Sequence, residues 1–135
     1  MNHGVLGIIC DILSRSDHYK DWAMSSIQRL IIPPVKLEQY IIFWKGSEPV
    51  GFLTWGLFSE GFIEAYLRGE EKITPETWLQ NGDQPFVTDF AVIGDAEDVI
   101  RAVKRAKLIG KSKFPDGATF RFRRVHSRRV GHVDV

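Results

Sequence analysis

The chain has 135 residues, the size of one ordinary domain, so we expect residues 1–135 to fold as a single domain. Its 44% hydrophobic and 26% charged residues match an average globular protein, which argues against a disordered chain or a coiled coil. The net charge is only +1, yet residues 1–100 carry seven basic and fifteen acidic side chains and residues 101–135 carry eleven basic and two acidic ones; this split predicts a polyanionic partner and leaves nucleic acid, an anionic membrane and an acidic protein open.

The first part of the chain predicts two helices. Apolar residues recur at helical spacing over residues 4–15, so we expect an amphipathic helix there. A second helix is expected over residues 21–30, with Asp21 as its N-cap. Pro33 and Pro34 should end it, because Pro33 lacks an N–H and Pro34 disfavours the α conformation in the residue before it.

The middle of the chain predicts a β-hairpin followed by a short helix. Residues 39–45 and 49–58 are rich in aromatic and β-branched residues, and a Gly-Ser pair that begins at Gly46 separates them. Ser59 is expected to cap a short helix that closes at Gly69.

The last part predicts a strand, a long helix and two further strands. We expect a loop around a short turn over residues 72–84, a strand over 85–93 and a helix over 95–108. Candidate strands cover 118–125 and 130–135. The helix is expected to turn four apolar residues inward: Val99, Ile100, Val103 and Ala106. The order α-α-β-β-α-β-α-β-β predicts an α/β (α+β) fold in which helices flank a mixed or antiparallel sheet.

The composition and the local patterns also argue against membrane insertion, a signal peptide, a disulfide and a metal site. The longest apolar runs are far shorter than the ~20 residues that span a bilayer, so we expect no stable membrane insertion. The N-terminus lacks the basic segment and cleavage site of a signal peptide. The one cysteine, Cys10, has no internal partner for a disulfide, which favours a reducing, cytoplasmic setting. No metal site is expected, because the four histidines follow no ligand spacing: His3, His18, His126 and His132.

Two polar residues stand out as candidates for a functional site. His18 follows the first predicted helix within a polar stretch, where a solvated loop histidine and a general base both fit. Asp89 interrupts an otherwise nearly apolar strand, so its carboxylate must be paired, at an exposed strand end or in a cleft. An ordinary edge-strand aspartate and an aspartate that orients an imidazole are the two interpretations.

Gly94 is a weaker candidate. A glycine between a strand and a helix lets a phosphopantetheine or a pyrophosphate approach the first N–H groups of the helix. The acidic residues that follow, Asp95, Glu97 and Asp98, would repel a phosphate and are also ordinary first-turn residues.

Short motifs occur in a fixed order along most of the chain. His18 is followed by Trp22, residues 49–55 spell Pro-Val-Gly-Phe-Leu-Thr-Trp, residues 86–94 spell Phe-Val-Thr-Asp-Phe-Ala-Val-Ile-Gly, and residues 120–125 spell Phe-Arg-Phe-Arg-Arg-Val. Further positions in the same order are Pro33, Gln39, Tyr40, Trp78, Gly82 and Asp83. Together these motifs resemble the RTX-toxin-activating lysine acyltransferases, the hemolysin-activator (C-protein) family.

The resemblance implies a fold similar to that of N-acetyltransferases and an enzyme that acylates protein lysines. The implied donor is acyl-acyl carrier protein, a phosphopantetheine thioester that serves as co-substrate with no other cofactor bound. The implied acceptor is the ε-amine of internal lysines in an RTX-type protoxin. The catalytic histidine and aspartate of the family fall on His18 and Asp89, and a homodimer is left open.

Two binding surfaces follow as hypotheses. An apolar groove for the acyl chain is expected among Trp22, Phe52, Trp55, Phe90 and the Gly94 turn, although each aromatic residue also fits a core position. Acyl carrier proteins are strongly acidic, so we expect the carrier to dock on basic residues. These are Arg101, Lys104, Arg105, Lys107, Arg121 and Arg124, with Lys111 and Lys113 beside them.

Two other functions remain open. Basic residues alternate with Phe120 and Phe122, which suits a strand that faces nucleic acid, although an amphipathic strand with the phenylalanines inward also explains the pattern. A catalytically inactive relative that acts as an adaptor for a carrier protein or a toxin is the other alternative. Nucleic acid is less favoured as a partner than an acyl carrier protein or a protoxin.

Overall fold

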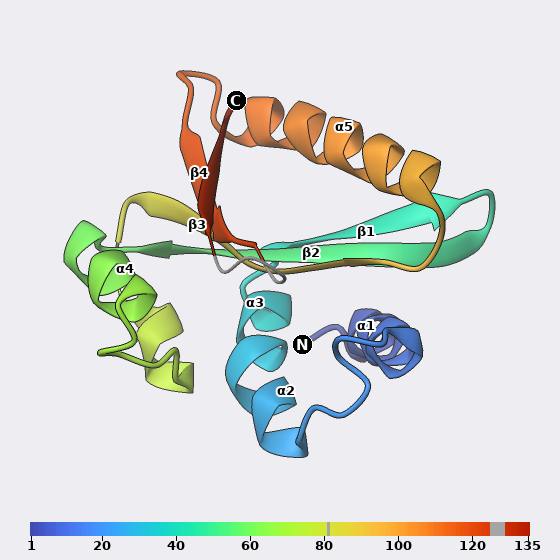
Figure 1. Cartoon of the computed structure of the whole chain (residues 1–135), viewed down its shortest axis with the longest axis horizontal. Coiled ribbons are helices and arrows are strands. Elements are labelled where there is room, and N and C mark those ends of the chain that lie inside the picture. The colour runs from blue at the N-terminus through green and yellow to red at the C-terminus, as the bar shows by residue number, and fades with distance from the viewer. Residues whose placement is uncertain (81, 125–128) are drawn as a thin grey trace.

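The computed structural model describes residues 1–80, 82–124 and 129–135, and a five-stranded mixed sheet forms its centre (Figure 1). The strands are β1 (Tyr40–Lys45), β2 (Glu48–Phe58), β3 (Gln84–Val92), β4 (Thr119–Arg123) and β5 (Val130–Asp134). They lie in the sheet in chain order, and all neighbours are antiparallel except β3 and β4. A parallel pair needs a crossover connection, which α5 (Ala96–Lys113) supplies.

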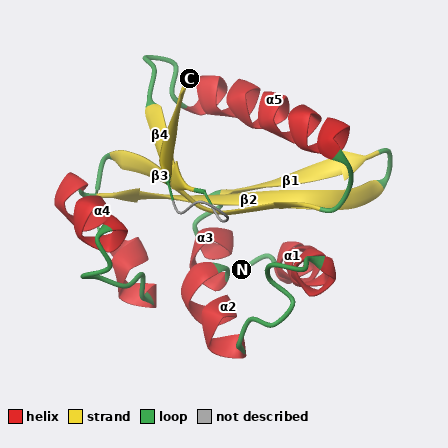
Figure 2. Cartoon of the chain, in the orientation of Figure 1, coloured by secondary structure: helices red, strands yellow, loops and turns green. Residues whose placement is uncertain are grey.

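Helices cover both sides of this sheet (Figure 2). One side carries α1 (His3–Arg15), α2 (Met24–Leu30), α3 (Ile32–Lys36), α4 (Glu60–Leu67) and the 3-10 helix η1 (Pro75–Leu79), whereas α5 runs along the other side. The predicted α/β class with a mixed sheet is therefore confirmed, while the likeness to the N-acetyltransferase fold stays a prediction. Within the described part of the chain, no helix combines the length and the hydrophobicity needed to cross a bilayer.

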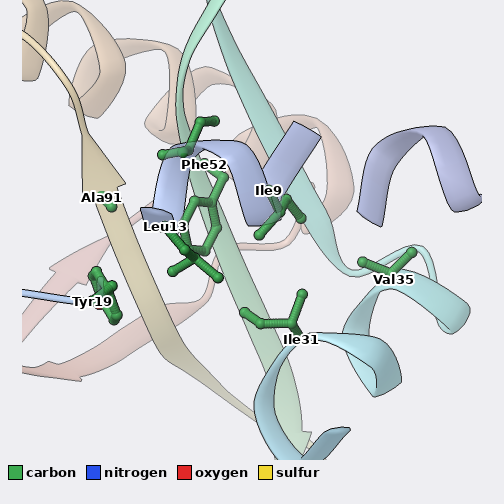
Figure 3. Packing of buried hydrophobic residues seen from close by; sticks show 8 residues of the cluster. Ile9, Leu13, Tyr19, Ile31, Val35, Phe52 and Ala91 are labelled. Atoms are coloured by element: carbon green, nitrogen blue, oxygen red, sulfur yellow. The ribbon is translucent and has the colours of Figure 1, made fainter. Parts of the chain in front are cut away.

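The side of the sheet that faces α1 and α3 is packed by a continuous hydrophobic core (Figure 3). The core cluster consists of Ile9, Ile12, Leu13, Tyr19, Ile31, Val35, Phe52 and Ala91. A second cluster lies between the sheet, α4 and η1 and consists of Phe58, Ile63, Ile73, Trp78 and Phe86. Burial of each large side chain of this kind contributes about 1.5–3 kcal/mol, so these two clusters hold the helices of this side in place.

Local sequence patterns located several element ends correctly. The Ser59 hydroxyl accepts a 3.1 Å hydrogen bond from the Phe62 N–H and caps α4. Gly46 in the hairpin turn and Gly69 after α4 adopt positive φ angles of 62° and 79°, a conformation that favours glycine. The strand predicted over residues 118–125 is β4, and its predicted last residue, Val125, lies outside the described residues.

Asp21 does not cap the second helix, so this prediction is wrong. Ala23 is the N-cap of α2, and the segment before it forms turns in which the N–H groups of Tyr19 and Lys20 both donate to the Ser16 carbonyl, at 3.1 and 2.8 Å. Because Tyr19 is buried in the core cluster, these turns are held in place and the helix begins later than the sequence pattern suggests.

Pro33 and Pro34 begin a helix instead of ending helical structure. They lie in the first turn of α3, where Ile31 is the N-cap. Backbone N–H groups in a first turn have no partner within the helix, so the missing proline N–H is tolerated there. The chain therefore passes from α2 into α3 with a change of direction at Ile31, whose φ is −113°.

The predicted inward face of α5 is correct in part: Val103 and Ala106 lie on the side that faces the sheet, and Val99 is half-buried. The prediction is wrong for Ile100, which is 53% exposed, and the buried residues of α5 include the small residues Ala102 and Gly110. Small residues let the helix backbone approach, and a Cβ placed on Gly110 would lie 3.1 Å from Cγ1 of Val135. This contact with the C-terminal strand supports the last turns of α5, which continue past the predicted end at residue 108 (Figure 1).

Phe52→Ala should lower the free energy of unfolding by about 3–5 kcal/mol, because Phe52 is fully buried in the core cluster. Urea unfolding followed by circular dichroism measures the change. Leu79→Ala, at a side chain that is 75% exposed, serves as the control and should change the same quantity by less than about 0.5 kcal/mol. Similar losses in the two variants would contradict this description of the core.

Candidate active site

A cavity of about 620 Å³ lies between α5 and the sheet, within the range of roughly 300–1,000 Å³ that is usual for small-molecule sites. The strands contribute apolar walls made of Ile41, Leu53, Trp55, Phe90, Phe120 and Phe122. The face of α5 that carries Val103 forms the opposite wall, so its apolar residues border a cavity and not a filled core. No group of three or more His, Cys, Asp or Glu side chains in the described ranges is placed to hold a metal ion.

A β-bulge in β3 places several of its residues on the cavity. Residues 87–90 all line it, whereas only alternate residues of a regular strand face one side. The pairing with β2 shifts here: Thr54 pairs with Asp89, and the next β2 residue pairs with Val87. Thr88 is therefore the extra residue of a bulge, and such a bulge re-aims the side chains beside it.

The Asp89 carboxyl is buried in the cavity wall, with 9% of the residue exposed. Its Oδ1 accepts a 3.2 Å hydrogen bond from the Tyr19 hydroxyl, whereas its Oδ2 has no partner among the described residues. Burial raises the pKa of Asp89 to about 8, although the Tyr19 hydrogen bond and the charge of Arg29 oppose the rise. Near neutral pH the Asp89 carboxyl therefore mostly keeps its proton, and its buried oxygen without a protein partner can pair with a ligand.

His18 lines the same cavity from the turn that follows α1, and its side chain is exposed. Its ring meets the Tyr19 ring edge-on, with 4.6 Å between the centroids. The structure thus brings His18 and Asp89 together at one cavity, and Tyr19 contacts both. In the described part of the chain the Asp89 hydrogen bond comes from Tyr19, and no hydrogen bond joins His18 to Asp89 directly.

The predicted acyl-binding aromatic residues divide between the cavity and the core. Trp55 and Phe90 line the cavity. Phe52 is buried in the core cluster, and Trp22 packs against that cluster with its ring 4.8 Å from the Tyr19 ring. Trp22 and Phe52 are therefore core residues, whereas Trp55 and Phe90 remain candidates for the acyl-binding groove.

Gly94 makes room for the first turn of α5. A Cβ at this position would clash with the carboxylate of Asp98. That carboxylate accepts a 3.1 Å hydrogen bond from the Asp95 N–H, and the Asp95 carboxylate accepts one of 3.0 Å from the Asp98 N–H, which together form a capping box. Gly94 is not among the residues that line the cavity, so the helix cap explains this glycine.

The predicted carrier-docking residues fall into two groups. Arg101 pairs with Asp98, and Arg121 donates to both carboxylate oxygens of Glu60, at 2.8 and 2.6 Å. The other basic side chains are exposed. Three of them also line the cavity, namely Lys107, Lys113 and Arg124, and three do not, namely Lys104, Arg105 and Lys111. The second group is therefore the one whose charge faces solvent next to the cavity.

Tyr19, Tyr66 and Arg123 are among the cavity residues that the sequence did not single out as candidates for the acyltransferase site. The Arg123 guanidinium lies 4.8 Å from the centroid of the Tyr66 ring and donates a 3.1 Å hydrogen bond to the Tyr66 carbonyl. Tyr19 directly follows His18, and a tyrosine in a polar turn is a hint of a buried hydroxyl that needs a partner. The identity of that partner, far along the sequence in β3, could not be predicted from a local pattern.

Comparison with known proteins identifies relatives of the chain. The model of the HlyC family, described as RTX toxin acyltransferases, matches residues 1–133. The leukotoxin-activating lysine-acyltransferase LktC of a Pasteurella haemolytica-like species is 26% identical over 100 residues, which cover 73% of this chain and 60% of that protein. The RTX-III toxin-activating lysine-acyltransferase ApxIIC of Actinobacillus pleuropneumoniae is 28% identical over 122 residues, which cover 90% of this chain and 65% of that protein.

A third relative is the protein-lysine myristoyltransferase HlyC of Escherichia coli. It is 22% identical over 129 residues, which cover 96% of this chain and 70% of that protein. The match spans 60% of the length of LktC and 65% of the length of ApxIIC. The chain therefore corresponds to about two thirds of each of these relatives.

Asp89→Asn should change the way stability depends on pH. The pKa of Asp89 is about 8 in the folded protein and about 3.9 in an unfolded chain, so between these values the folded protein holds a proton that the unfolded chain releases. The free energy of unfolding should therefore fall as the pH rises from about 4 to about 8, by up to about 1.4 kcal/mol per pH unit, and the variant should lack this contribution.

Urea unfolding of both proteins across this pH range measures the difference. Asp116→Asn, which removes an exposed carboxyl, is the control and should keep the wild-type pH dependence. Parallel curves for the wild type and Asp89→Asn would contradict a proton held by buried Asp89.

Proposed function

The chain belongs to the RTX toxin acyltransferase family, and on this premise we propose that it transfers a fatty acyl group from acyl-acyl carrier protein to lysine ε-amines of an RTX-type protoxin. The observation that best supports this function is the apolar cavity of about 620 Å³ whose lining includes an imidazole, His18, and a buried carboxyl, Asp89. The apolar volume suits an acyl chain, and the two titratable groups suit proton transfer beside it.

The walls of the cavity suit the hydrocarbon part of the donor. Each methylene that moves from water into apolar surroundings contributes about 0.8 kcal/mol, so a long chain gains affinity mainly through burial. Trp55 and Phe90, which line the cavity, are proposed to contact this chain. One relative is named a protein-lysine myristoyltransferase, and a long-chain acyl group is the class of occupant that we expect.

His18 is proposed as the general base of the transfer. A lysine side chain is mostly an ammonium near neutral pH and must lose a proton before it attacks. That first proton leaves to solvent. As the neutral amine bonds to the thioester carbonyl carbon, His18 would take a second proton from the lysine nitrogen, and it would give this proton to the carrier sulfur as the carbon–sulfur bond breaks. A transient acyl group on His18 is the alternative route, and it uses the same residue.

Asp89 is proposed to favour the protonated form of His18 during the reaction. A positive charge near a carboxyl group favours its ionised form, so protonation of His18 and ionisation of Asp89 support each other. The raised pKa of Asp89 fits this coupling, because a carboxyl group that titrates near neutral pH responds to a charge that appears beside it.

The outer face of α5 is proposed as the docking surface for the carrier protein. Lys104 and Arg105 are exposed there, and both lie on the opposite side of the sheet from α1–α4 (Figure 2). Lys107, Lys113 and Arg124 line the cavity and would face the phosphate of the phosphopantetheine arm. Charge complementarity of this kind mainly raises the rate of association and selects the partner.

The nucleic-acid alternative has little support in the geometry. Phe120 packs against Trp55 and Phe114, with ring centroids 6.1 and 5.4 Å apart, and Phe122 lines the cavity. These rings are engaged inside the protein, so they are not available to stack on bases. The inactive-adaptor alternative is decided by whether acyl transfer takes place.

His18→Ala and Asp89→Ala should each lower lysine acylation by about 10²–10⁴-fold, because one removes the proposed general base and the other removes the carboxyl group that favours its protonated form. The measurement is mass spectrometry of the RTX-III protoxin, the kind of target named for the Actinobacillus relative, after incubation with myristoyl-acyl carrier protein. His132→Ala, at an exposed histidine of β5, is the matched control and should keep wild-type activity. Folded variants of His18 and Asp89 with normal activity would remove this pair from the mechanism.

Reversal of the charge at Lys104 and Arg105 should raise the KM for the carrier-bound donor about 10-fold at low salt and weaken its dependence on salt. The double variant Lys104→Glu/Arg105→Glu tests this with steady-state kinetics in about 20–300 mM NaCl. The matched control is Lys36→Glu/Lys72→Glu, which makes the same change in net charge at two exposed residues on the other side of the sheet. Equal effects of the two double variants would place the docking surface elsewhere.

A further inference from the structure

We propose that Tyr19 is a positioning residue of the site, which holds the Asp89 carboxyl through its hydroxyl and supports the His18 imidazole through its ring. This inference rests on the function proposed above for His18 and Asp89. It adds a third residue to the site, one that would act on the reaction through its two neighbours.

Tyr19 is itself held firmly in place. It is 5% exposed and belongs to the core cluster beneath the sheet, next to Ala91 of β3 (Figure 3). Its ring packs edge-on against Trp22 and is tilted against Phe52, with centroids 4.8 and 6.3 Å away. A buried aromatic ring with contacts on several sides has one orientation, so its hydroxyl points to one place.

That place is the edge of the cavity where Asp89 lies. The Tyr19 hydroxyl is 3.2 Å from Oδ1 of Asp89 and 3.5 Å from the Phe90 carbonyl. With Oδ1 occupied in this way, Oδ2 is the oxygen left without a partner. The hydrogen bond therefore decides which carboxyl oxygen is available to His18 or to a ligand.

The Tyr19 hydroxyl can act only as a donor toward an ionised carboxylate. Burial, reinforced by the charge of Asp89, raises the pKa of Tyr19 well above its ordinary value, so the phenol keeps its proton throughout the working pH range. Its hydrogen bond lowers the pKa of Asp89 against the effect of burial. Tyr19 therefore makes the ionised form of Asp89 more accessible near neutral pH.

Other titratable groups also act on Asp89, but they are unchanged when the Tyr19 hydroxyl is removed. Arg29 of α2 lowers its pKa, and a coulombic interaction links it to Tyr66 of α4. The remaining charged or titratable groups that line the cavity are His18, Lys107, Lys113, Arg123 and Arg124. A shift between the wild type and Tyr19→Phe therefore reports the hydroxyl itself.

Tyr19→Phe keeps the ring and removes the hydroxyl. We expect kcat/KM for acylation to fall about 10-fold near pH 7 and the acidic limb of its pH profile to move about one unit upward, so that activity partly recovers at higher pH. Tyr40→Phe is the matched control, since Tyr40 packs against the same core cluster from β1 but does not line the cavity. It should change neither the rate nor the profile.

A second measurement does not depend on acyl transfer. In urea unfolding, the decrease in stability with rising pH should continue to a higher pH in Tyr19→Phe than in the wild type, because the pKa of Asp89 rises when the hydrogen bond is lost. A displaced curve supports the coupling whether or not acylation is detected, and an undisplaced one overturns it. A folded Tyr19→Phe protein whose activity falls equally at every pH also overturns the proposal, because that is the result of a purely structural role.

Discussion

The helices on the two sides of the sheet pack against it differently, and the candidate site depends on this difference. On one side, α1 and α3 press a continuous core against β2 and β3. On the other side, α5 approaches through small residues such as Ala102 and Gly110 and leaves a cavity of about 620 Å³. Protein interiors are otherwise filled like organic crystals, so an apolar space of this size between a helix and a sheet is a place where a ligand is expected.

Tyr19 connects these two sides of the protein. It belongs to the core cluster and also lines the cavity, where its hydroxyl donates a hydrogen bond to Asp89 of β3. The packed side therefore fixes the position of a hydroxyl that acts on the open side. A buried carboxyl group with one oxygen unpaired is unfavourable for folding by itself, and sites of this kind occur where a protein uses the group for binding or catalysis.

The uneven charge of the sequence is partly neutralised by the fold. Glu60 pairs with Arg121 and Asp98 pairs with Arg101, so acidic residues of the first hundred positions meet basic residues of the last quarter. Exposed ion pairs contribute little to stability. Their main effect here is that the paired basic residues are less available to bind a partner. The charge that remains next to the cavity lies on α5 and at the end of β4, which narrows the surface on which an acidic carrier protein is proposed to dock.

Local sequence patterns were sufficient to locate most of the helices and strands and to draw attention to Asp89. Caps, turns and periodic apolar residues act over a few positions, so Ser59, Gly69 and the strand around Asp89 could be located correctly from local patterns. The same reasoning failed where two local interpretations compete. Pro33 is compatible with the end and with the start of a helix, and the apolar stripe of α5 wrongly included Ile100, whose side chain is exposed.

The set of residues that come together at the candidate site could be identified only from the folded chain. The sequence marked His18 and Asp89 separately, but their placement at one cavity depends on the turn after α1 reaching β3, and the Tyr19 hydrogen bond depends on the same long-range contact. The fold likewise assigned Trp22 and Gly94 to packing and to a helix cap. Local patterns specify the conformation of short segments, whereas contacts between distant segments arise from the way that all buried surfaces fit together, and no single segment contains that information.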